Sequence, residues 1–377
     1  MLTLNQLPTD IITDILSRFP AKTVVSLKIV CKLWCNLIND DEFVHVHVKQ
    51  SLATKTNLHF IVSPSKLYLR NCFYPSTEIR PLLYSADFDS FDNPIDLSHP
   101  FKNYKTQVGV IGSCRGLLLL RVDDGHLLLY NPTTQTYNKL PLLPEEPCDR
   151  PVFGFGYDIF SKDWKCVRIM QVVYQCEVMV YSFKGNSWKK LVDVPRFSEP
   201  GNWGIGALVH EMIHWVGTNT NIVTFSLRDE TFTSLPLPSF EVKSDDYLYV
   251  GDLDGCLCVL ANCYLECNVW IMKEYGVAES WTRMFRYEKH RWESLTRPVS
   301  FSMEKEKLFV LTSLQKLVYI DLQSTELTEV MLTNCDNGLG VNVYAENILQ
   351  LDCPERIRIT KKPGKGKNKK KNRRNNY

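Results

Sequence analysis

Five large aromatic side chains recur through the middle of the chain at nearly constant spacing. They are Tyr130, Tyr181, Phe225, Trp270 and Tyr319, separated by 51, 44, 45 and 49 residues. A repeat of this length is typical of β-propellers, in which each blade is a four-stranded sheet. The alternative architecture is a twisted β-sandwich, and the regular period favours the propeller.

A second aromatic residue follows three of these anchors at a distance of seven residues. These partners are Tyr137, Trp188 and Phe232. In the fourth repeat Trp281 comes eleven residues after its anchor, which an insertion at 275–278 explains. The fifth repeat is degenerate, because it offers only Leu327, eight residues after its anchor. The unit of repetition is thus blade-like.

Turn residues mark hairpins inside two of the repeats. Asp254-Gly255 precedes the strand-like segment 256–260, and Asp123-Asp124-Gly125 separates the segments 117–120 and 127–130. Asp-Gly pairs tolerate the positive φ values that tight hairpins require.

Strand-like segments also flank the repeats at both ends. The segments 58–62 and 66–69 precede the first repeat, and the segments 341–344 and 347–351 follow the last. Neither pair completes a sheet alone, and a propeller leaves no open edge. We therefore predict that the two pairs share one blade, which closes the ring and brings the number of blades to about six.

The first 48 residues carry a helical pattern instead. Ile11, Ile12, Ile15, Leu16 and Phe19 share one helical face, which Pro20 ends. A second apolar series runs through Leu27, Val30, Cys31, Trp34 and Ile38. Two amphipathic helices are predicted. Because so short a segment is marginal as an isolated domain, it is either a cap packed on its own protein or a docking module with a partner-facing apolar patch.

The composition fits one small and one large folded unit. The chain has 377 residues, of which 44% are hydrophobic, enough for a sizeable core. No basic stretch followed by an apolar run opens the sequence, so no signal peptide is expected, and no apolar run reaches membrane-spanning length. Thirteen cysteines without a framework suit a reducing compartment, which we expect to be the cytoplasm, the nucleus or both.

The formal net charge of +2 conceals an uneven distribution. Residues 356–377 contain eleven Lys and Arg and no acidic residue, which leaves 33 basic and 42 acidic residues in the rest of the chain. An acidic body argues against nucleic-acid binding by the large domain. The tail repels itself and is expected to be disordered. Its role is that of an inert solvated tail, a nuclear-import signal or a contact for RNA or an acidic partner.

One motif points to a different class of protein. His210-Glu211-Met212-Ile213-His214 has the HExxH spacing of zinc peptidases, which requires a helix. The flanking segments 207–209 and 213–216 read as strands, and the repeat register places His210 and Glu211 at a hairpin. We expect the two imidazoles to diverge there, so the zinc peptidase is kept only as a rival hypothesis.

A group of cysteines is a second candidate metal site. Its members are Cys256, Cys258, Cys263 and Cys267. The spacing lacks the Cys-x2-Cys turns usual in structural zinc sites, and strand alternation puts Cys256 and Cys258 on one face. Core packing is favoured over a structural metal, and no cofactor is expected.

The N-terminal segment resembles an F-box. The matching residues are Leu7-Pro8-Thr9-Asp10, residues 15–22 and residues 30–38, with Phe19 where the family usually has Leu. From about residue 109 to 332 the chain resembles the plant F-box-associated interaction domain, found in the S-locus F-box group and in plant immunity regulators. The segments that carry this likeness are Gly112-Ser113-Cys114-Arg115-Gly116, Tyr130-Asn131-Pro132-Thr133-Thr134, Gly154-Phe155-Gly156-Tyr157-Asp158, Leu253-Asp254-Gly255-Cys256 and residues 269–277.

The resemblance implies an α+β multidomain protein. It would comprise a small all-α F-box at 1–48, a connector with the first strands at 49–108, an all-β kelch-like propeller at 109–355 and the disordered basic tail at 356–377. The implied function is that of a non-catalytic substrate-recognition subunit of a Skp-cullin-F-box ubiquitin ligase, with a Skp-type adaptor, a cullin and an unknown protein substrate as partners. The alternative is a scaffold that binds the adaptor without promoting degradation.

The resemblance and the loop pattern also give candidate site residues. The F-box positions that face the adaptor, or hold the helices that face it, are Leu7, Pro8, Ile12, Ile15, Leu16, Val30, Cys31 and Trp34. Aromatic residues and arginines in long irregular segments are candidates for substrate binding, because these types are enriched at binding hot spots. They are Trp203, Phe240, Arg291 and Trp292. The alternative for Trp203 and Trp292 is burial beneath their own loops.

Overall fold

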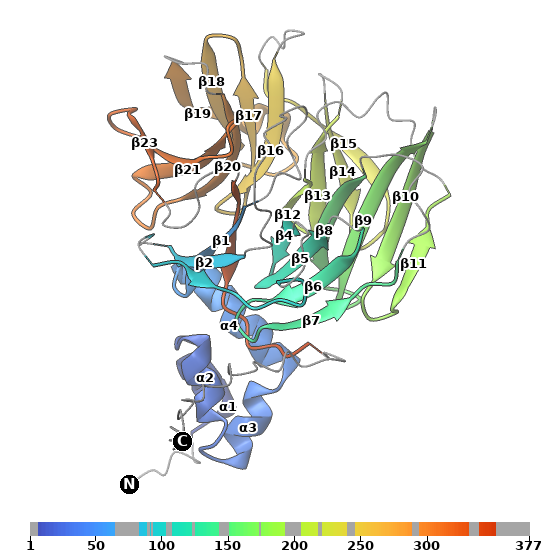
Figure 1. The fold of residues 1–377 in the computed structure, drawn as a ribbon, viewed down its shortest axis with the longest axis vertical. Coiled ribbons are helices and arrows are strands. Elements are labelled where there is room, and N and C mark those ends of the chain that lie inside the picture. The colour runs from blue at the N-terminus through green and yellow to red at the C-terminus, as the bar shows by residue number, and fades with distance from the viewer. Residues whose placement is uncertain are drawn as a thin grey trace, which may run out of the picture.

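The structure, a computed structural model, has a group of four helices and a ring of six β-sheets (Figure 1). It describes residues 7–64, 83–88, 91, 93–102, 108–122, 125–142, 151–172, 175–192, 205–217, 221–239, 246–288, 294–331 and 339–351. The predicted basic tail at 356–377 lies outside these residues. No helix in the described part of the chain is long and apolar enough to cross a membrane.

The helices are α1 (Thr9–Ser17), α2 (Ala21–Leu27), α3 (Lys32–Ile38) and α4 (Asp41–Thr54). The sequence predicted one helix for the apolar series that begins at Leu27, and this prediction is wrong. The chain leaves the helical conformation between residues 28 and 31, which separates α2 from α3. The β-branched residues Ile29 and Val30 favour this break, since they have low helix propensity and are not buried. Asp40 caps α4 by accepting a 2.8 Å hydrogen bond from the backbone N–H of Glu42. The predicted boundary at residue 48 falls inside α4.

Each sheet of the ring has four antiparallel strands. Blade 1 comprises β4 (Val108–Cys114), β5 (Leu117–Val122), β6 (Leu127–Asn131) and β7 (Thr136–Lys139). Blade 2 comprises β8 (Val152–Asp158), β9 (Asp163–Val172), β10 (Gln175–Ser182) and β11 (Ser187–Lys190). Blade 3 comprises β12 (Ala207–Val209), β13 (Met212–Val216), β14 (Asn221–Ser226) and β15 (Phe232–Pro236). Blade 4 comprises β16 (Tyr247–Leu253), β17 (Cys256–Asn262), β18 (Glu266–Met272) and β19 (Trp281–Glu288), with the 3-10 turn η2 (Ala278–Ser280) before β19. Blade 5 comprises β20 (Leu295–Phe301), β21 (Lys307–Thr312), β22 (Leu317–Asp321) and β23 (Leu327–Glu329).

The sixth sheet combines the two ends of the propeller sequence and is called the composite blade. Its strands are β24 (Leu339–Ala345), β1 (Leu58–Pro64), β2 (Tyr84–Asp87) and β3 (Ile95–Asp96), in that order. Leu58 pairs with Ala345, and the ladder continues to Pro64 and Leu339. The predicted closure of the ring and the six blades are confirmed, whereas the predicted segment 66–69 lies outside the described residues. The C-terminal contribution is one strand rather than a hairpin, because residues 346–351 leave the sheet to bind blade 1 and the helices.

The repeated aromatic pairs face each other across neighbouring strands. Tyr130 pairs with Tyr137, Tyr181 with Trp188, and Phe225 with Phe232. In blade 4 the pattern differs: Trp281 lies opposite Met272 and Arg283 opposite Trp270, because eight residues, 273–280, connect β18 and β19. Trp188 and Trp281 each donate an indole N–H to a carbonyl of the preceding blade, that of Pro141 or Pro236. The aromatic repeat thus joins strands within blades and, at these tryptophans, one blade to the next.

The innermost strands of the six blades surround a central channel. They are β4, β8, β12, β16, β20 and β24, and each contacts the next around the ring. The turns between the first and second strands of blades 1 to 5 open on the face that α4 covers, which we call the helix-side face. The opposite face, where the second and third strands of each blade are joined, is called the distal face.

Candidate functional site

The helical module exposes more apolar surface than a self-contained unit would. The exposed apolar side chains of α1, α2, α3 and the residues between them are Ile11, Ile15, Phe19, Val25, Ile29, Val30 and Leu33, which together we call the apolar surface of α1–α3. Ile29 is 90% exposed and Val30 is 52% exposed. Apolar groups gathered in this way on a soluble protein mark an interaction site.

The structure divides the predicted adaptor residues into two groups. Ile12 and Leu16 are buried with Val24 and Phe43 in the core of the helices, so they hold the helices together. Pro8, Ile15 and Val30 are exposed, whereas Leu7, Cys31 and Trp34 are half-buried. The role of all eight in adaptor binding stays a prediction.

Several exposed residues were absent from the predicted set. They are Ile11, Phe19, Val25, Ile29 and Leu33. The Ile11-Ile12 doublet could have indicated that one of these two residues is exposed. Neighbouring side chains in a helix point about 100° apart, so both cannot face one core. Ile29 carried no such signal, since its exposure follows from the break between α2 and α3.

Helix α4 is bound to the helix-side face of the propeller by charged and aromatic contacts. Lys55, just after the helix, forms a 2.9 Å ion pair with Asp254 in the first turn of blade 4. Arg115, in the corresponding turn of blade 1, donates a 2.8 Å hydrogen bond to Nδ1 of His45 and lies 4.2 Å from the ring of Tyr157. Nε2 of His45 is 3.0 Å from the hydroxyl of Tyr157. Burial, together with the charge of Arg115, lowers the pKa of His45, which suits the neutral imidazole that this arrangement requires.

The segment after β24 joins the same helices to blade 1. Ile348 is buried in the core of the helical module, and Leu349 packs on both that core and the core of blades 1 and 2. The side-chain amide of Asn131 donates to the carbonyls of Asn347 and Leu349 at 2.9 and 2.6 Å. Helices and propeller are therefore held by buried apolar contacts as well as by ion pairs.

The HExxH motif lies in a hairpin, as predicted. His210 and Glu211 form the turn between β12 and β13, with φ values of 49° and 63°, and His214 lies within β13. The expectation that the imidazoles diverge is wrong: both rings contact Tyr275, at centroid distances of 4.9 and 5.6 Å, because the blade 4 insertion reaches over them.

Hydrogen bonds to both ring nitrogens nevertheless exclude His214 as a free metal ligand. Its Nδ1 is 3.2 Å from the carbonyl of Ala207, and its Nε2 is 2.8 Å from the hydroxyl of Tyr275. Burial lowers the pKa of His214 to about 4, so the ring is neutral and structural. A zinc peptidase needs both histidines on one helical face, and this strand does not provide it.

Two members of the cysteine group belong to the core between strands, whereas Cys256 and Cys263 are half-buried. Cys258 and Cys267 are fully buried in the cluster that joins blades 4 and 5, while Leu257 faces the opposite cluster. Burial raises the pKa of the Cys258 thiol well above its ordinary value. Within the described ranges, no three His, Cys, Asp or Glu side chains come together as a metal site.

The predicted substrate residues Trp203, Phe240, Arg291 and Trp292 lie outside the described residues. Other apolar side chains at strand ends and turns of the distal face are exposed: Leu142, Val192, Tyr247, Tyr264, Leu265, Leu314 and Met331. Tyr264 and Leu265 occupy the turn between β17 and β18 and are 88% and 70% exposed. Polar residues usually fill such turns, so this pair was a signal that sequence reasoning missed.

Comparison with known proteins agrees with this architecture. A family model described as the F-box associated beta propeller domain matches residues 33–349, and one for the F-box domain matches residues 4–45. The chain belongs to the F-box proteins that carry an F-box associated β-propeller domain.

Its relatives include several proteins of Arabidopsis thaliana. F-box protein CPR1 is 30% identical over 383 residues, which cover 91% of this chain and 88% of that protein. F-box protein At4g22390 is 28% identical, over 91% of this chain and 90% of its own length. F-box/kelch-repeat protein At3g23880 is 27% identical, over 74% of this chain and 79% of its own length.

Proposed function

We propose that the protein is the substrate-recognition subunit of a Skp-cullin-F-box ubiquitin ligase. The observation that carries this proposal is the apolar surface of α1–α3, which lies within the F-box and on which the described part of the chain leaves Ile29 and Val30 uncovered. A Skp-type adaptor would bury this surface and link the protein to a cullin.

The propeller would hold the substrate without catalysing a reaction itself. Its contribution to ubiquitin transfer would be proximity, because a lysine held near the conjugating enzyme reacts as an effectively intramolecular partner. The contacts between α4, residues 346–349 and the propeller support this role, since they fix the direction in which the substrate is presented.

The distal face is our candidate for the substrate-binding surface. It lies opposite the helices, and it exposes Val192, Tyr264 and Leu265 in addition to the strand ends that border the predicted loops. Aromatic side chains in such positions are common binding anchors. We place the activity in the cytoplasm or nucleus, because the thirteen cysteines of the sequence follow no disulfide framework.

Affinity capture with quantitative mass spectrometry tests the proposal. The double variant Ile29→Asp/Val30→Asp should lose the adaptor and the cullin, while Val192→Asp, an equally simple change of an exposed valine on the propeller, should retain both. Proteins that are captured by the wild type and accumulate when the cullin is inhibited are the expected substrates. Bound proteins whose levels do not respond to cullin inhibition would favour the scaffold instead.

Point variants are preferable to a deletion of residues 1–48. Such a deletion would cut α4 and remove His45 from Arg115. Loss of a captured protein could then come from a damaged propeller rather than from loss of the adaptor.

A further inference from the structure

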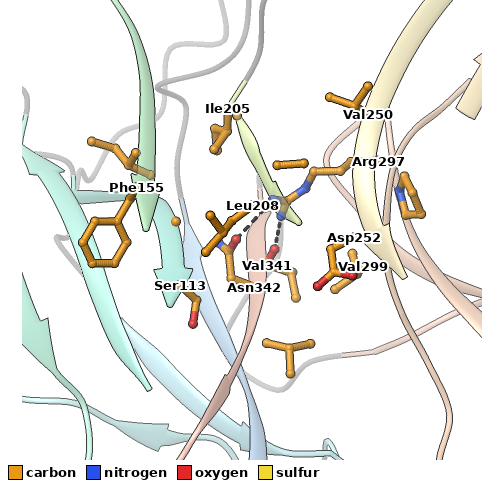
Figure 2. A pocket seen from close by; sticks show the side chains of 16 residues that line it. Ser113, Phe155, Ile205, Leu208, Val250, Asp252, Arg297, Val299, Val341 and Asn342 are labelled. Atoms are coloured by element: carbon orange, nitrogen blue, oxygen red, sulfur yellow. Dashed lines mark hydrogen bonds between the residues drawn. The ribbon is translucent and has the colours of Figure 1, made fainter. Parts of the chain in front are cut away.

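The central channel widens into a cavity beneath α4. This cavity, which we call the mouth, has a volume of about 860 Å³ and is lined by α4 and by turns of the helix-side face. A chamber of about 160 Å³ lies deeper, between all six innermost strands (Figure 2). Ser113, Leu208, Asp252, Val299 and Val343 line both spaces, so the two are continuous there. We call these five residues the throat.

Asp252 places a carboxylate in the throat without a cationic partner among the described residues. One of its oxygens accepts a 2.8 Å hydrogen bond from the backbone N–H of Gly255. Arg297, the cation of the inner chamber, instead donates to Asn342 at 3.1 Å and to the carbonyl of Val341 (Figure 2). Although Asp252 meets solvent inside the channel, burial by the surrounding strands raises its pKa to about 6.

The cations around the mouth are all engaged elsewhere. Lys55 and Lys305 pair with Asp254 at 2.9 and 2.8 Å, and Arg115 binds His45. Glu211, which also lines the mouth, has no ion-pair partner within the described ranges. Among the acidic side chains that line the mouth, Asp252 and Glu211 are thus the two that form no ion pair within the described ranges, and an ammonium group placed against Asp252 would supply the missing partner.

The shape of the mouth favours a small molecule. Leu52, Ala53, Thr54 and Lys55 line one side of the cavity and restrict the approach of a folded partner. Apolar side chains make up much of the remaining wall, among them Ile159, Leu208 and Met303. Small-molecule sites typically enclose about 300–1,000 Å³, with mostly apolar walls and a few polar groups that fix the ligand.

We propose that the throat and mouth bind a small organic cation, with its ammonium group against Asp252 and its apolar part along Leu208 and Met303. The bound cation would touch both α4 and the propeller, because both supply the wall. It would thereby add a contact between the part of the protein that carries the apolar surface of α1–α3 and the part that carries the distal face.

The test uses the full-length protein, with n-hexylammonium as the probe and n-hexanol as its neutral isostere. Saturable binding of n-hexylammonium, measured by ligand-observed NMR at pH 7.5, is expected for the wild type, with n-hexanol much weaker. Asp252→Asn should weaken binding of the ammonium about tenfold or more, because a charge-assisted contact is lost. The fold should be kept, since the amide oxygen of Asn can still accept from Gly255.

Glu304→Gln is the matched control, because Glu304 lies on the same face next to Lys305 but does not line the mouth. It should bind as the wild type does, which excludes a general effect of surface charge. Equal binding by Asp252→Asn and the wild type would overturn the proposal, and so would equal affinities for the amine and the alcohol.

Discussion

The carboxylate of Glu346 accepts a 2.7 Å hydrogen bond from the backbone N–H of Ala21, which lies 325 residues earlier in the chain. Ala21 begins α2, and Glu346 directly follows β24, the strand that closes the propeller. The other carboxylate oxygen is 3.5 Å from Nε2 of His59 in β1. Closure of the ring and placement of the helices thus depend on the same short segment.

Replacement of Glu346 should therefore destabilise the protein. We expect Glu346→Ala to lower the free energy of unfolding by about 1.5–3 kcal/mol, the usual value for hydrogen bonds to a charged group. Glu346→Gln should cost less, because its amide oxygen can still accept from Ala21. Chemical denaturation followed by circular dichroism measures both.

The effect of Glu346 should depend on pH. Burial alone would raise the pKa of this carboxyl, but hydrogen bonds from His59 and Ala21 outweigh burial and hold it below the ordinary 4.5. A carboxyl with a lowered folded-state pKa stabilises the protein above its unfolded pKa and loses this effect as the pH falls. The difference between wild type and Glu346→Ala should hence shrink below about pH 4.5; a constant difference would contradict the contact.

Two glycines in left-handed turns, Gly116 and Gly125, allow a controlled test of how residues 345–347 pack. At Gly116, with φ of 77°, an added Cβ would lie 2.5 Å from the carbonyl oxygen of Ala345 and 2.6 Å from Cβ of Asn347. At Gly125, with φ of 83°, it would meet no atom within 4 Å. Gly125→Ala should cost about 1–2 kcal/mol of stability from backbone strain alone. Gly116→Ala should cost about 1–3 kcal/mol more, and equal losses would show that residues 345–347 do not pack there.

Substitutions of Ile11 and Ile12 should affect stability differently, because Ile11 is exposed and Ile12 is buried. Ile12 is 2% exposed, so Ile12→Ala should lower the free energy of unfolding by about 2–5 kcal/mol. Ile11 is 44% exposed, so Ile11→Ala should change stability by no more than about 0.5 kcal/mol while weakening adaptor binding. The reverse order of stabilities would mean that α1 is rotated relative to the structure described.

Asp252 should cost the protein stability at neutral pH. Its folded-state pKa of about 6 lies above the ordinary 3.8, so the penalty for ionisation in the folded state grows between these two pH values, is complete above about pH 6 and is absent below 3.8. Because channel solvent screens this charge, Asp252→Asn should stabilise by no more than about 1 kcal/mol, or about 2 °C in Tm, at pH 7.5. The gain should be smaller at pH 5, and scanning calorimetry at the two pH values measures it.

The local repeat was sufficient to predict the propeller. Tyr181 and Trp188 lie opposite each other because a four-residue loop between paired strands imposes a separation of seven residues. The same regularity predicted the hairpin at His210, and the Asp-Gly pair predicted the hairpin at Asp254. It failed for Trp281, which faces Met272 rather than Trp270, since the eight-residue connection 273–280 between β18 and β19 sets a different register.

The contacts between helices and propeller could not be predicted in this way. Glu346 binds Ala21, and Arg115 binds His45, across long separations in sequence, so no local period connects them. The split between α2 and α3 was missed because the apolar spacing from Leu27 to Ile38 is compatible with one helix. Which of the F-box residues are exposed depends on that split.

Titration of purified protein with a purified Skp-type adaptor, by isothermal calorimetry, tests the central claim most directly. The wild type and Val192→Asp should bind with the same affinity, whereas Ile29→Asp/Val30→Asp should show no measurable binding, because two charges would be buried against an apolar partner. The melting temperature of the double variant should match that of the wild type, since both side chains are exposed. Unchanged affinity in the double variant would contradict docking through the apolar surface of α1–α3.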